Sequence, residues 1–340
     1  MKASPKKCLI VGPAWVGDMI MAQSLFIALK QKYPELIIDV LAPAWSEPLL
    51  ASMSEVNESI VMSLGHGQLD LKKRYQLGKS LRKNHYDWAI VLPNSLKSAL
   101  VPFWANIPRR TAYKGEMRYG LINDMHHLDK QKLTMTVQRF VALAGESDVD
   151  APDYAFPALK IEQIDQKRVL TSFKLDQRLP ILALCPGAEY GSAKCWPAEH
   201  YAAVAKKAIS ENWQVWILGS EKDRAIAEEI KTAVGSEQCL QLAGETTLEQ
   251  VIILLSLASQ VISNDSGLMH IAAAVDSPVI ALYGSSDPNF TPPLNVNAQI
   301  VTLNMSCSPC FKRECPLGHL KCLQDITPDS VWKRMDIKIG

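Results

Sequence analysis

Residues 11–21, VGPAWVGDMIM, place a carboxylate where helices often bind phosphate. An apolar run (8–11) leads into a glycine turn, and a helical pattern follows with Asp18 in its first turn. The spacing from Gly12 to Gly17 is that of a P-loop, but the Lys and Ser/Thr of that motif are absent, as are the three glycines of the dinucleotide fingerprint. Since Asp18 would repel an anion, it is either a first-turn acid stabilised by unpaired N–H groups or a general base for a hydroxyl.

A loop in the second half of the chain, CPGAEYGSAKCWP (185–197), has the composition of a phosphate-binding loop. Its two glycines and small serine expose backbone N–H groups, and Lys194 adds a cation that can act as a point charge on a diphosphate. The alternative is that Lys194 is an ordinary solvent-exposed loop lysine.

The most specific pattern is NDSGLMH (264–270), where a strand-like run ends and a helix begins. Ser266 and Gly267 can present a hydroxyl and backbone N–H groups to an anion at the helix N-terminus, and Asp265 can accept hydrogen bonds from sugar hydroxyls. His270 follows one turn later. The alternative is an aspartate N-cap before a buried histidine, but the position at the carboxyl end of a strand favours binding.

Two further acidic patterns differ in their expected use. Glu221, in LGSEKD, comes just after a strand-like run, where a carboxylate can bind ribose hydroxyls; an exposed first-turn acid is the alternative. The pair Asp148 and Asp150 lies beside a proline-rich stretch and is expected to be solvated rather than to bind a metal. Without a metal, leaving-group charge must fall on Lys194 and the helix end at Ser266.

Positive charge is concentrated in one segment of an otherwise balanced chain. The 340 residues carry a formal net charge of +1, so no global field attracts nucleic acid or a membrane. Residues 72–118 nonetheless hold eleven Lys and Arg against two acids, or +9, which leaves −8 for the remainder. We expect an anionic partner for this segment. A solvated helix face explains residues 72–83 equally well, whereas 108–120, PRRTAYKGEMRYG, has no helical period and is expected to form a binding loop.

Four of the eight cysteines crowd into one C-terminal segment. They are Cys307, Cys310, Cys315 and Cys322, with His319 between the last two. A structural metal is one interpretation, because CxxC with further thiols can bind zinc. The spacing CxxCx4Cx6C is not a standard zinc pattern, so free thiols in a loop are favoured. The other cysteines lie in predicted buried strands (8, 185, 239) or in a loop (195), which fits a reducing compartment.

No apolar run reaches the ~18 residues that a membrane span needs. The start of the chain, MKASPKKCLIVG, is basic but has only a short apolar stretch, so it is not expected to be a signal peptide. We expect a cytoplasmic protein.

Strand-like runs alternate with helical stretches in two blocks. The first block has runs at 8–11, 37–42, 59–62 and 88–93; the second has runs at 181–187, 214–220, 239–244, 260–265 and 278–284, with helical patterns at 197–211, 221–234, 247–258 and 267–275. The proline-rich stretch 150–163 between them predicts a linker. Such alternation indicates parallel sheets covered on both faces. We therefore predict an α/β fold with two Rossmann-like domains, which bind ligands beyond the carboxyl ends of their strands.

Eight segments, in this order, resemble sequence blocks of glycosyltransferase family 9. They are GPAWVGDMIM, APAWSEPLL, LPNSLKSALVPF, NIPRRTAYKGEMRYGLIND, CPGAEYGSAKCWP, AGETTLEQ, NDSGLMHIAAA and ALYGSSDPNFTPPL. The resemblance implies the GT-B fold, with two Rossmann-like domains facing a cleft, and an inverting transfer that requires no cofactor. It divides the chain into an acceptor-binding domain (1–165), a nucleotide-sugar-binding domain (175–325) and a C-terminal helix (326–340) that returns to the first domain.

The resemblance also assigns roles to individual residues. The family's catalytic acid falls on Asp18 and its phosphate-binding lysine on Lys194. The donor-binding residues it implies are Lys194, Glu221, Asp265, Ser266, Gly267 and His270. The acceptor-binding residues are expected among Asn94, Lys97, Arg109, Arg110, Lys114 and Arg118. Residues 296–325 are not anchored by the resemblance.

The blocks of the first domain are most similar to those of family members that add the second heptose of lipopolysaccharide. This implies transfer of L-glycero-D-manno-heptose from ADP-heptose to the first heptose of a phosphorylated lipid A–core acceptor. The chain is then expected to be a monomer in peripheral contact with the cytoplasmic face of the inner membrane. An epimerase, or a transferase for another sugar nucleotide, is the alternative among enzymes. A solute-binding protein would need a secretory signal, and a nucleic-acid partner is not expected because few aromatic residues lie among the cations.

Overall fold

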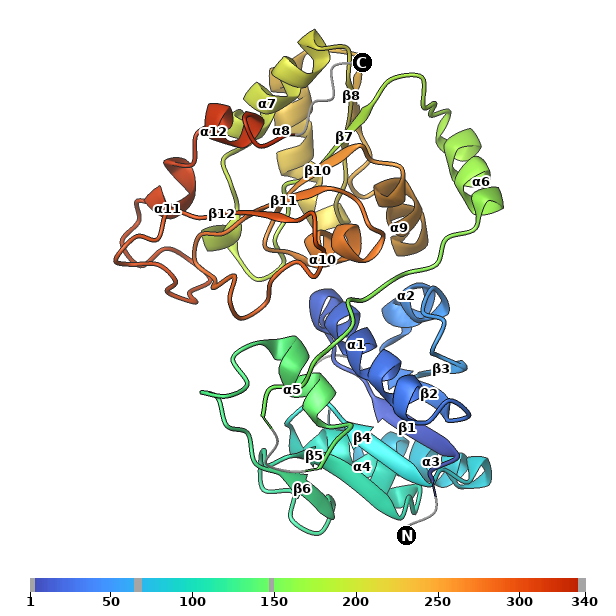
Figure 1. Ribbon diagram of the computed structural model, residues 1–340. Coiled ribbons are helices and arrows are strands. Elements are labelled where there is room, and N and C mark those ends of the chain that lie inside the picture. Colours follow the sequence, from blue (N-terminus) through green and yellow to red (C-terminus); the bar gives the residue numbers. More distant parts are fainter. Residues whose placement is uncertain (1–3, 64–68, 147–149, 336–340) are drawn as a thin grey trace. The chain divides into compact units, whose positions relative to one another are not determined.

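The computed structural model describes residues 4–63, 69–146 and 150–335, in two compact units. The first unit is Met1–Leu159 and the second is Lys160–Gly340. Each is built on a six-stranded parallel sheet with helices packed against it (Figure 1). Residues 150–162 contain neither helix nor strand, so the boundary between the units falls in the predicted linker. The α/β class predicted from the alternating runs is confirmed.

The first unit has the strand order β3-β2-β1-β4-β5-β6. Its strands are β1 (Lys7–Val11), β2 (Ile37–Ala42), β3 (Glu58–Val61), β4 (Trp88–Val91), β5 (Arg109–Tyr113) and β6 (Asp124–His126), and its helices are α1 (Val16–Lys32), α2 (Glu47–Ala51), α3 (Leu71–Leu81), α4 (Leu96–Trp104) and α5 (Thr136–Ala142). Strand β5 corrects the expectation that 108–120 is a loop throughout. The segment is a strand because it pairs with β4 and β6. Its two arginines make a strand hard to recognise from the sequence alone.

The second unit has the order β12-β11-β10-β7-β8-β9. Its strands are β7 (Ile181–Cys185), β8 (Gln214–Ile217), β9 (Cys239–Gln241), β10 (Gln260–Asn264), β11 (Val279–Leu282) and β12 (Gln299–Val301), and its helices are α6 (Gln163–Phe173), α7 (Ala198–Ser210), α8 (Arg224–Val234), α9 (Leu248–Ser256), α10 (Gly267–Ala274), α11 (Lys321–Gln324) and α12 (Pro328–Trp332). Every residue of β7, β8, β10 and β11 is buried, which explains why these strands are mostly apolar.

Counted within each unit, both sheets have the Rossmann order 3-2-1-4-5-6. The order reverses between β1 and β4 in the first unit and between β7 and β10 in the second. Ligands of open parallel sheets bind beyond the carboxyl ends of the strands at such a switch point. The loops after β1 and β4, and after β7 and β10, are therefore where functional residues are expected. The cysteines predicted to lie in strands, Cys8, Cys185 and Cys239, are buried there.

The C-terminal helix does not return to the first unit. Helix α12 packs against α7, and Val331, Trp332 and Met335 belong to the hydrophobic core of the second unit. The ammonium group of Lys207 lies 5.1 Å from the centre of the Trp332 ring. The expectation for 326–340 is thus wrong for the part that the structure describes, because the apolar side of this segment completes the sheet cover of its own unit. Residues 336–340 lie outside the described ranges.

Two smaller expectations concern the linker and the membrane. Asp148 of the Asp-x-Asp pair lies outside the described residues, whereas Asp150 is exposed and its carboxylate pairs with Lys132 at 2.9 Å. Within the described ranges, no helix is both long enough and apolar enough to cross a bilayer.

Replacing Trp332 by alanine tests the placement of α12. The change removes a buried indole from the core of the second unit, so we expect that unit to lose about 3 kcal/mol of unfolding free energy. Hydrogen exchange followed by mass spectrometry should become faster in α7 and stay unchanged in α1. Faster exchange in α1, with α7 unaffected, would instead place the segment on the first unit.

Candidate functional site

An asparagine joins the two central loops of the second unit at the switch point of its sheet. Asn264 is the last residue of β10 and is fully buried. Its Oδ1 accepts hydrogen bonds from the Trp196 backbone N–H and the Tyr201 hydroxyl, both at 3.0 Å, and its Nδ2 donates to the Pro186 carbonyl at 2.6 Å. The loop after β7 is therefore fixed to the end of β10. This brings together the loops that carry Lys194 and Asp265.

Lys194 and Asp265 form an ion pair in this position. Lys194 ends a short 3₁₀ turn (Ser192–Lys194), and its Nζ lies 2.5 Å from Oδ2 of Asp265. The two side chains are only 18% and 6% exposed, so the pair is largely withdrawn from water. The ammonium also lies 5.2 Å from the centre of the Tyr190 ring. A local carboxylate therefore balances the charge of Lys194, and the alternative of an ordinary solvent-exposed loop lysine does not describe this side chain.

The start of α10 lies beside this ion pair. Ser266 is its N-cap residue and Gly267 its first residue, so both stand at the end of the helix where N–H groups lack intrahelical partners. The Ser266 hydroxyl is 3.3 Å from that of Ser263. A group with negative charge would be stabilised here by the helix N-terminus and by the adjacent ammonium. The predicted juxtaposition of Lys194 with residues 265–267 is confirmed, and their binding role stays a prediction.

His270 is buried one turn into α10, and within the described ranges its Nδ1 has no hydrogen-bond partner. The pKa of its imidazole is lowered to about 4, mainly by burial; the Asp265 carboxylate opposes the shift and the Lys194 ammonium contributes to it. The ring is therefore neutral near pH 7. It supplies a neutral polar group beneath the ion pair rather than a third charge.

Glu221 stands apart from this group, at the end of β8. Its side chain is 71% exposed and forms a two-point ion pair with Arg224, with both contacts at 2.9 Å. Hydrogen bonds from Arg224 hold the pKa of the carboxyl below its usual range. Arg224 also pairs with Glu245 at 2.6 Å. Because β8 adjoins β7, Glu221 lies on the same edge of the sheet as Lys194, but within the described chain its partner is Arg224.

In the first unit, Asp18 occupies the third position of α1, directly beyond β1. The residue is partly exposed, and the N-cap residue Trp15 supplies no side-chain hydrogen bond to the helix. The carboxylate therefore sits where the helix dipole favours an anion. The sequence placed it correctly at the carboxyl edge of the sheet, after β1, the strand next to β4.

Two of the predicted acceptor residues lie at the opposite edge. Arg109 and Arg110 begin β5, so they stand at its amino end. Arg109 pairs with Asp124 at 2.7 Å and lies over the Trp88 ring at 4.2 Å. Arg110 donates to the carbonyls of Ile107 and Leu121. These guanidinium groups hold the strand and its flanking loops together, which does not support an acceptor role.

Arg118 is a second correction, because it is only 1% exposed. Its guanidinium donates to the carbonyls of Pro93 and Tyr113, both at 2.7 Å, and to Asn94 Oδ1 at 3.3 Å. Burial lowers the pKa of this group. Arg118 therefore ties the loop after β4 to the end of β5 and positions Asn94 without facing solvent.

The predicted acceptor residues that do reach the carboxyl edge are Asn94, Lys97 and Lys114. Asn94 and Lys114 are exposed and Lys97 is partly exposed. They follow β4, which pairs with β1, and β5, which pairs with β4. The edge thus combines Asp18 with two lysines, an amide and Glu116, whose carboxylate accepts from the Leu96 N–H at 2.7 Å. Such a set can hold an anionic, hydroxylated molecule and accept a proton from it.

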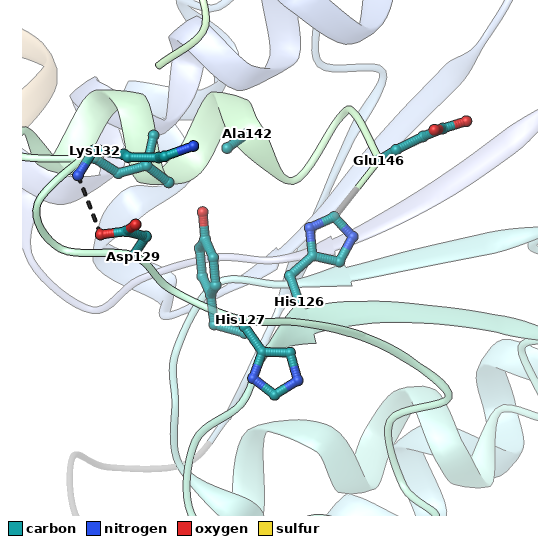
Figure 2. Close-up of a pocket in the computed structure, with 8 residues that line it drawn as sticks. His126, His127, Asp129, Lys132, Ala142 and Glu146 are labelled. Atoms are coloured by element: carbon teal, nitrogen blue, oxygen red, sulfur yellow. Dashed lines mark hydrogen bonds between the residues drawn. The ribbon is translucent and has the colours of Figure 1, made fainter. Parts of the chain in front are cut away.

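A pocket of about 80 Å³ lies at the ends of β5 and β6 (Figure 2). It is lined by side chains of mixed charge, including His126, His127, Asp129, Lys132 and Glu146. The Lys132 backbone N–H donates to Asp129 at 3.2 Å. The volume is well below the 300–1,000 Å³ typical of a ligand site. This pocket alone does not accommodate a sugar.

Sequence reasoning missed the residues that hold the site in shape. Asn264 directly precedes Asp265 in the NDSG pattern. An asparagine at the end of an apolar strand is a signal that its amide can hydrogen-bond the backbone of a neighbouring loop. Tyr190 lies within the quoted loop as an aromatic residue near the lysine. Arg224 had no recognisable signal beyond its spacing of three residues from Glu221 on a helix start.

His270 makes the stability of the second unit depend on pH. Its pKa is about 4 in the folded chain and about 6.5 when unfolded, so the unfolded state binds more protons between these values. Stability is therefore full above about pH 6.5 and is lost as the pH falls toward 4, by up to about 3 kcal/mol. His270→Gln should flatten this slope in urea denaturation between about pH 4 and pH 7. An unchanged slope would show that other groups cause it.

Comparison with known proteins places the chain in a family. The model of "Glycosyltransferase family 9 (heptosyltransferase)" matches residues 74–321. The chain is 49% identical over 338 residues to lipopolysaccharide heptosyltransferase 2 of Salmonella typhimurium (strain LT2), covering 97% of both chains. It is 47% identical to lipopolysaccharide heptosyltransferase 2 of Escherichia coli (strain K12), again with 97% of each covered.

Solved structures agree with this placement. The E. coli ADP-heptose lps heptosyltransferase II structure matches with a TM-score of 0.87 and 45% identity, covering 96% of this chain and 97% of that one. The E. coli heptosyltransferase WaaC with ADP matches with a TM-score of 0.71 at 21% identity, which is a likeness of fold alone. Together with the family match over most of the chain, these findings establish the GT-B fold. The chain belongs to glycosyltransferase family 9, the heptosyltransferases.

Proposed function

We propose that this enzyme adds the second heptose of the lipopolysaccharide inner core. The reaction is the inverting transfer of L-glycero-D-manno-heptose from ADP-heptose to the first heptose of a phosphorylated lipid A–core acceptor. The observation that carries the proposal is the 49% identity, along nearly the whole chain, to a lipopolysaccharide heptosyltransferase 2. Because this acceptor is a membrane glycolipid, the proposal includes peripheral contact with the membrane surface.

The second unit takes the nucleotide sugar in this proposal. The diphosphate lies against Lys194 and the N-terminus of α10 at Ser266 and Gly267, where an ammonium and unpaired N–H groups are already positioned. Asp265 holds the ammonium in place through the 2.5 Å ion pair. We also assign its carboxylate to a sugar hydroxyl of the donor, since it lies beside the group that binds the diphosphate. Glu221, exposed on the neighbouring strand end, is assigned to the ribose.

Lys194 and the N-terminus of α10 also stabilise the negative charge that develops on ADP as it leaves. A preorganised cation and helix N-terminus in a partly dry site stabilise a developing anion more strongly than water does. The Asn264 hydrogen bonds keep the loops of Lys194 and Asp265 in register, so little reorganisation accompanies the reaction. The proposal assigns no cofactor to the transfer.

The first unit takes the acceptor and supplies the base. Lys97 and Lys114, with Asn94, are assigned to the phosphates and carboxylates of the acceptor because they lie at the carboxyl edge. Asp18 accepts the proton of the attacking hydroxyl as the new bond forms at the anomeric carbon. The ADP–sugar bond breaks on the opposite face, which inverts that carbon. An anionic residue suits this task because it repels the donor phosphates and attracts a hydroxyl proton.

A transferase for another sugar nucleotide is distinguished by the nucleobase of its donor. The proposal expects ADP to bind more tightly than UDP in isothermal titration. Tighter binding of UDP would replace the proposed donor by a uridine nucleotide while leaving the fold and family unchanged.

Lys194→Gln should weaken ADP binding through the loss of the diphosphate contact. A hydrogen bond to a charged group is worth roughly 1.5–3 kcal/mol, so the Kd should rise about tenfold to a hundredfold. AMP, which lacks the second phosphate, should lose less affinity and reports whether the nucleotide pocket is intact. Lys206→Gln, an exposed lysine of α7, serves as the matched control. Equal effects of Lys194→Gln and Lys206→Gln on ADP would contradict the assignment.

Asp18→Asn should abolish most turnover without affecting the donor site. Loss of a general base lowers kcat by about 10²–10⁴, whereas the Kd for ADP should stay within about twofold, which corresponds to less than RT. Glu47→Gln removes another first-turn acid of the first unit, at the start of α2, and should have no such effect. Near-normal turnover by Asp18→Asn, measured as ADP release with the glycolipid acceptor, would assign the base to another residue.

A further inference from the structure

The four C-terminal cysteines surround one small cavity in the second unit. Cys307, Cys310, Cys315 and Cys322 all line a cavity of about 20 Å³. We call it the cysteine cavity. A volume of this size holds one water molecule or one ion. The segments that carry the thiols are separate turns after β12 and the start of α11, so the fold gathers them at one point.

The cavity is anchored to the core on one side. Cys322 lies in α11 beside Leu323, which is fully buried in the hydrophobic core of the unit. Gly284 lies against both residues: a Cβ built on it would stand 3.1 Å from the Cys322 sulfur and 2.6 Å from Leu323 Cγ. This close approach places the end of β11 beside the thiols.

The turn at Cys315 is closed by a backbone hydrogen bond, in which the Gly318 N–H donates to the Cys315 carbonyl at 3.1 Å. Cysteine binds metals as the thiolate. His319 lies on the same turn, but its Nδ1 accepts a hydrogen bond from the Lys321 N–H at 3.0 Å. A neutral ring in this state carries its proton on Nε2, so the nitrogen that remains cannot coordinate.

An unsatisfied polar group also faces the cysteine cavity. Ser285 lines it and is 1% exposed, and its Oγ has no hydrogen-bond partner among the residues that the structure describes. Buried hydroxyls are normally satisfied, so an orphaned one points to a missing partner. The Ser285 hydroxyl can donate a hydrogen bond to the sulfur of a thiolate ligand.

We propose that the cysteine cavity binds one thiophilic transition-metal ion, zinc or iron, through the four cysteine sulfurs. A tetrahedral set of four thiolates is characteristic of these metals. As the side chains stand, no three His, Cys, Asp or Glu residues among those described form a group that could hold a metal ion. Binding therefore includes rotation of the thiols toward the cavity centre and release of their protons to water. The Ser285 hydroxyl then donates to a bound sulfur.

The metal would brace the loop that carries Lys194. Between Cys310 and Cys315, the Phe311 carbonyl accepts from the Tyr190 hydroxyl at 2.9 Å, and the Arg313 carbonyl accepts from the Ala193 N–H at 3.0 Å. Ala193 is adjacent to Lys194 and itself lines the cysteine cavity. Gly191, with φ +154°, is in van der Waals contact with the segment between Cys310 and Cys315, since a Cβ there would lie 2.3 Å from the Arg313 carbonyl oxygen. The site is thus structural and supports the donor loop.

Metal analysis of the full-length chain tests the proposal. Protein purified under reducing conditions without chelators should contain about one zinc or iron per chain by plasma mass spectrometry. Cys315→Ser and Cys310→Ser should lose at least about tenfold in metal affinity, whereas Cys195→Ser, which alters a thiol outside the cavity, should retain the metal.

A second measurement covers variants that fail to fold. Co²⁺ added to reduced, metal-stripped wild-type protein should give thiolate-to-cobalt charge-transfer absorption, and the four thiols should become unreactive to a disulfide reagent. A wild-type chain with neither metal nor cobalt absorption, and with four reactive thiols or two disulfides, overturns the proposal.

The bracing effect has its own readout, and this part alone rests on the proposed donor site. Removing the metal should raise the Kd for ADP about tenfold, within the usual range of coupling between sites. Metal bound at full occupancy with unchanged ADP affinity would remove the bracing role. Loss of ADP binding in the metal-loaded wild type would instead count against the proposed function.

Discussion

The ion pair between Lys194 and Asp265 is the interaction on which the proposed donor site of the second unit depends. Two opposite charges at 2.5 Å are held largely out of water by the loops after β7 and β10. Asn264 fixes these loops to each other through its buried amide. Breaking such a pair by removing one partner leaves a desolvated charge, which is more costly than the pair is beneficial. The pair therefore keeps a cation beside the α10 N-terminus in one defined position.

The two units have the same strand order but opposite charge at the equivalent turn. After the first strand of its sheet, the second unit presents Lys194, whereas the first unit presents Asp18. In the proposed function, this difference lets one Rossmann-like unit bind a diphosphate and the other present a proton acceptor. The proposal thus divides a transfer reaction between two units of the same topology through single residues.

The sequence predicted where functional residues lie better than what each charged group contacts. Apolar runs and turn residues place Asp18, Lys194 and Asp265 at the carboxyl edges, because strand ends can be read from local patterns. Whether a cation is available depends on partners distant in sequence. Arg118 lies 25 residues from the Pro93 carbonyl that accepts from it, so nothing local distinguishes it from the exposed Lys114. The placement of α12 on α7 was missed for the same reason, since it depends on long-range packing.

The central claim is that the donor's phosphates bind only to the second unit. A crystal structure of the enzyme with ADP tests it most directly. The account predicts that the terminal phosphate lies within hydrogen-bond distance of Lys194 Nζ and the N–H groups at Ser266 and Gly267, with Asp18 facing the solvent of the acceptor edge. A diphosphate bound at the Gly12–Asp18 turn would contradict it.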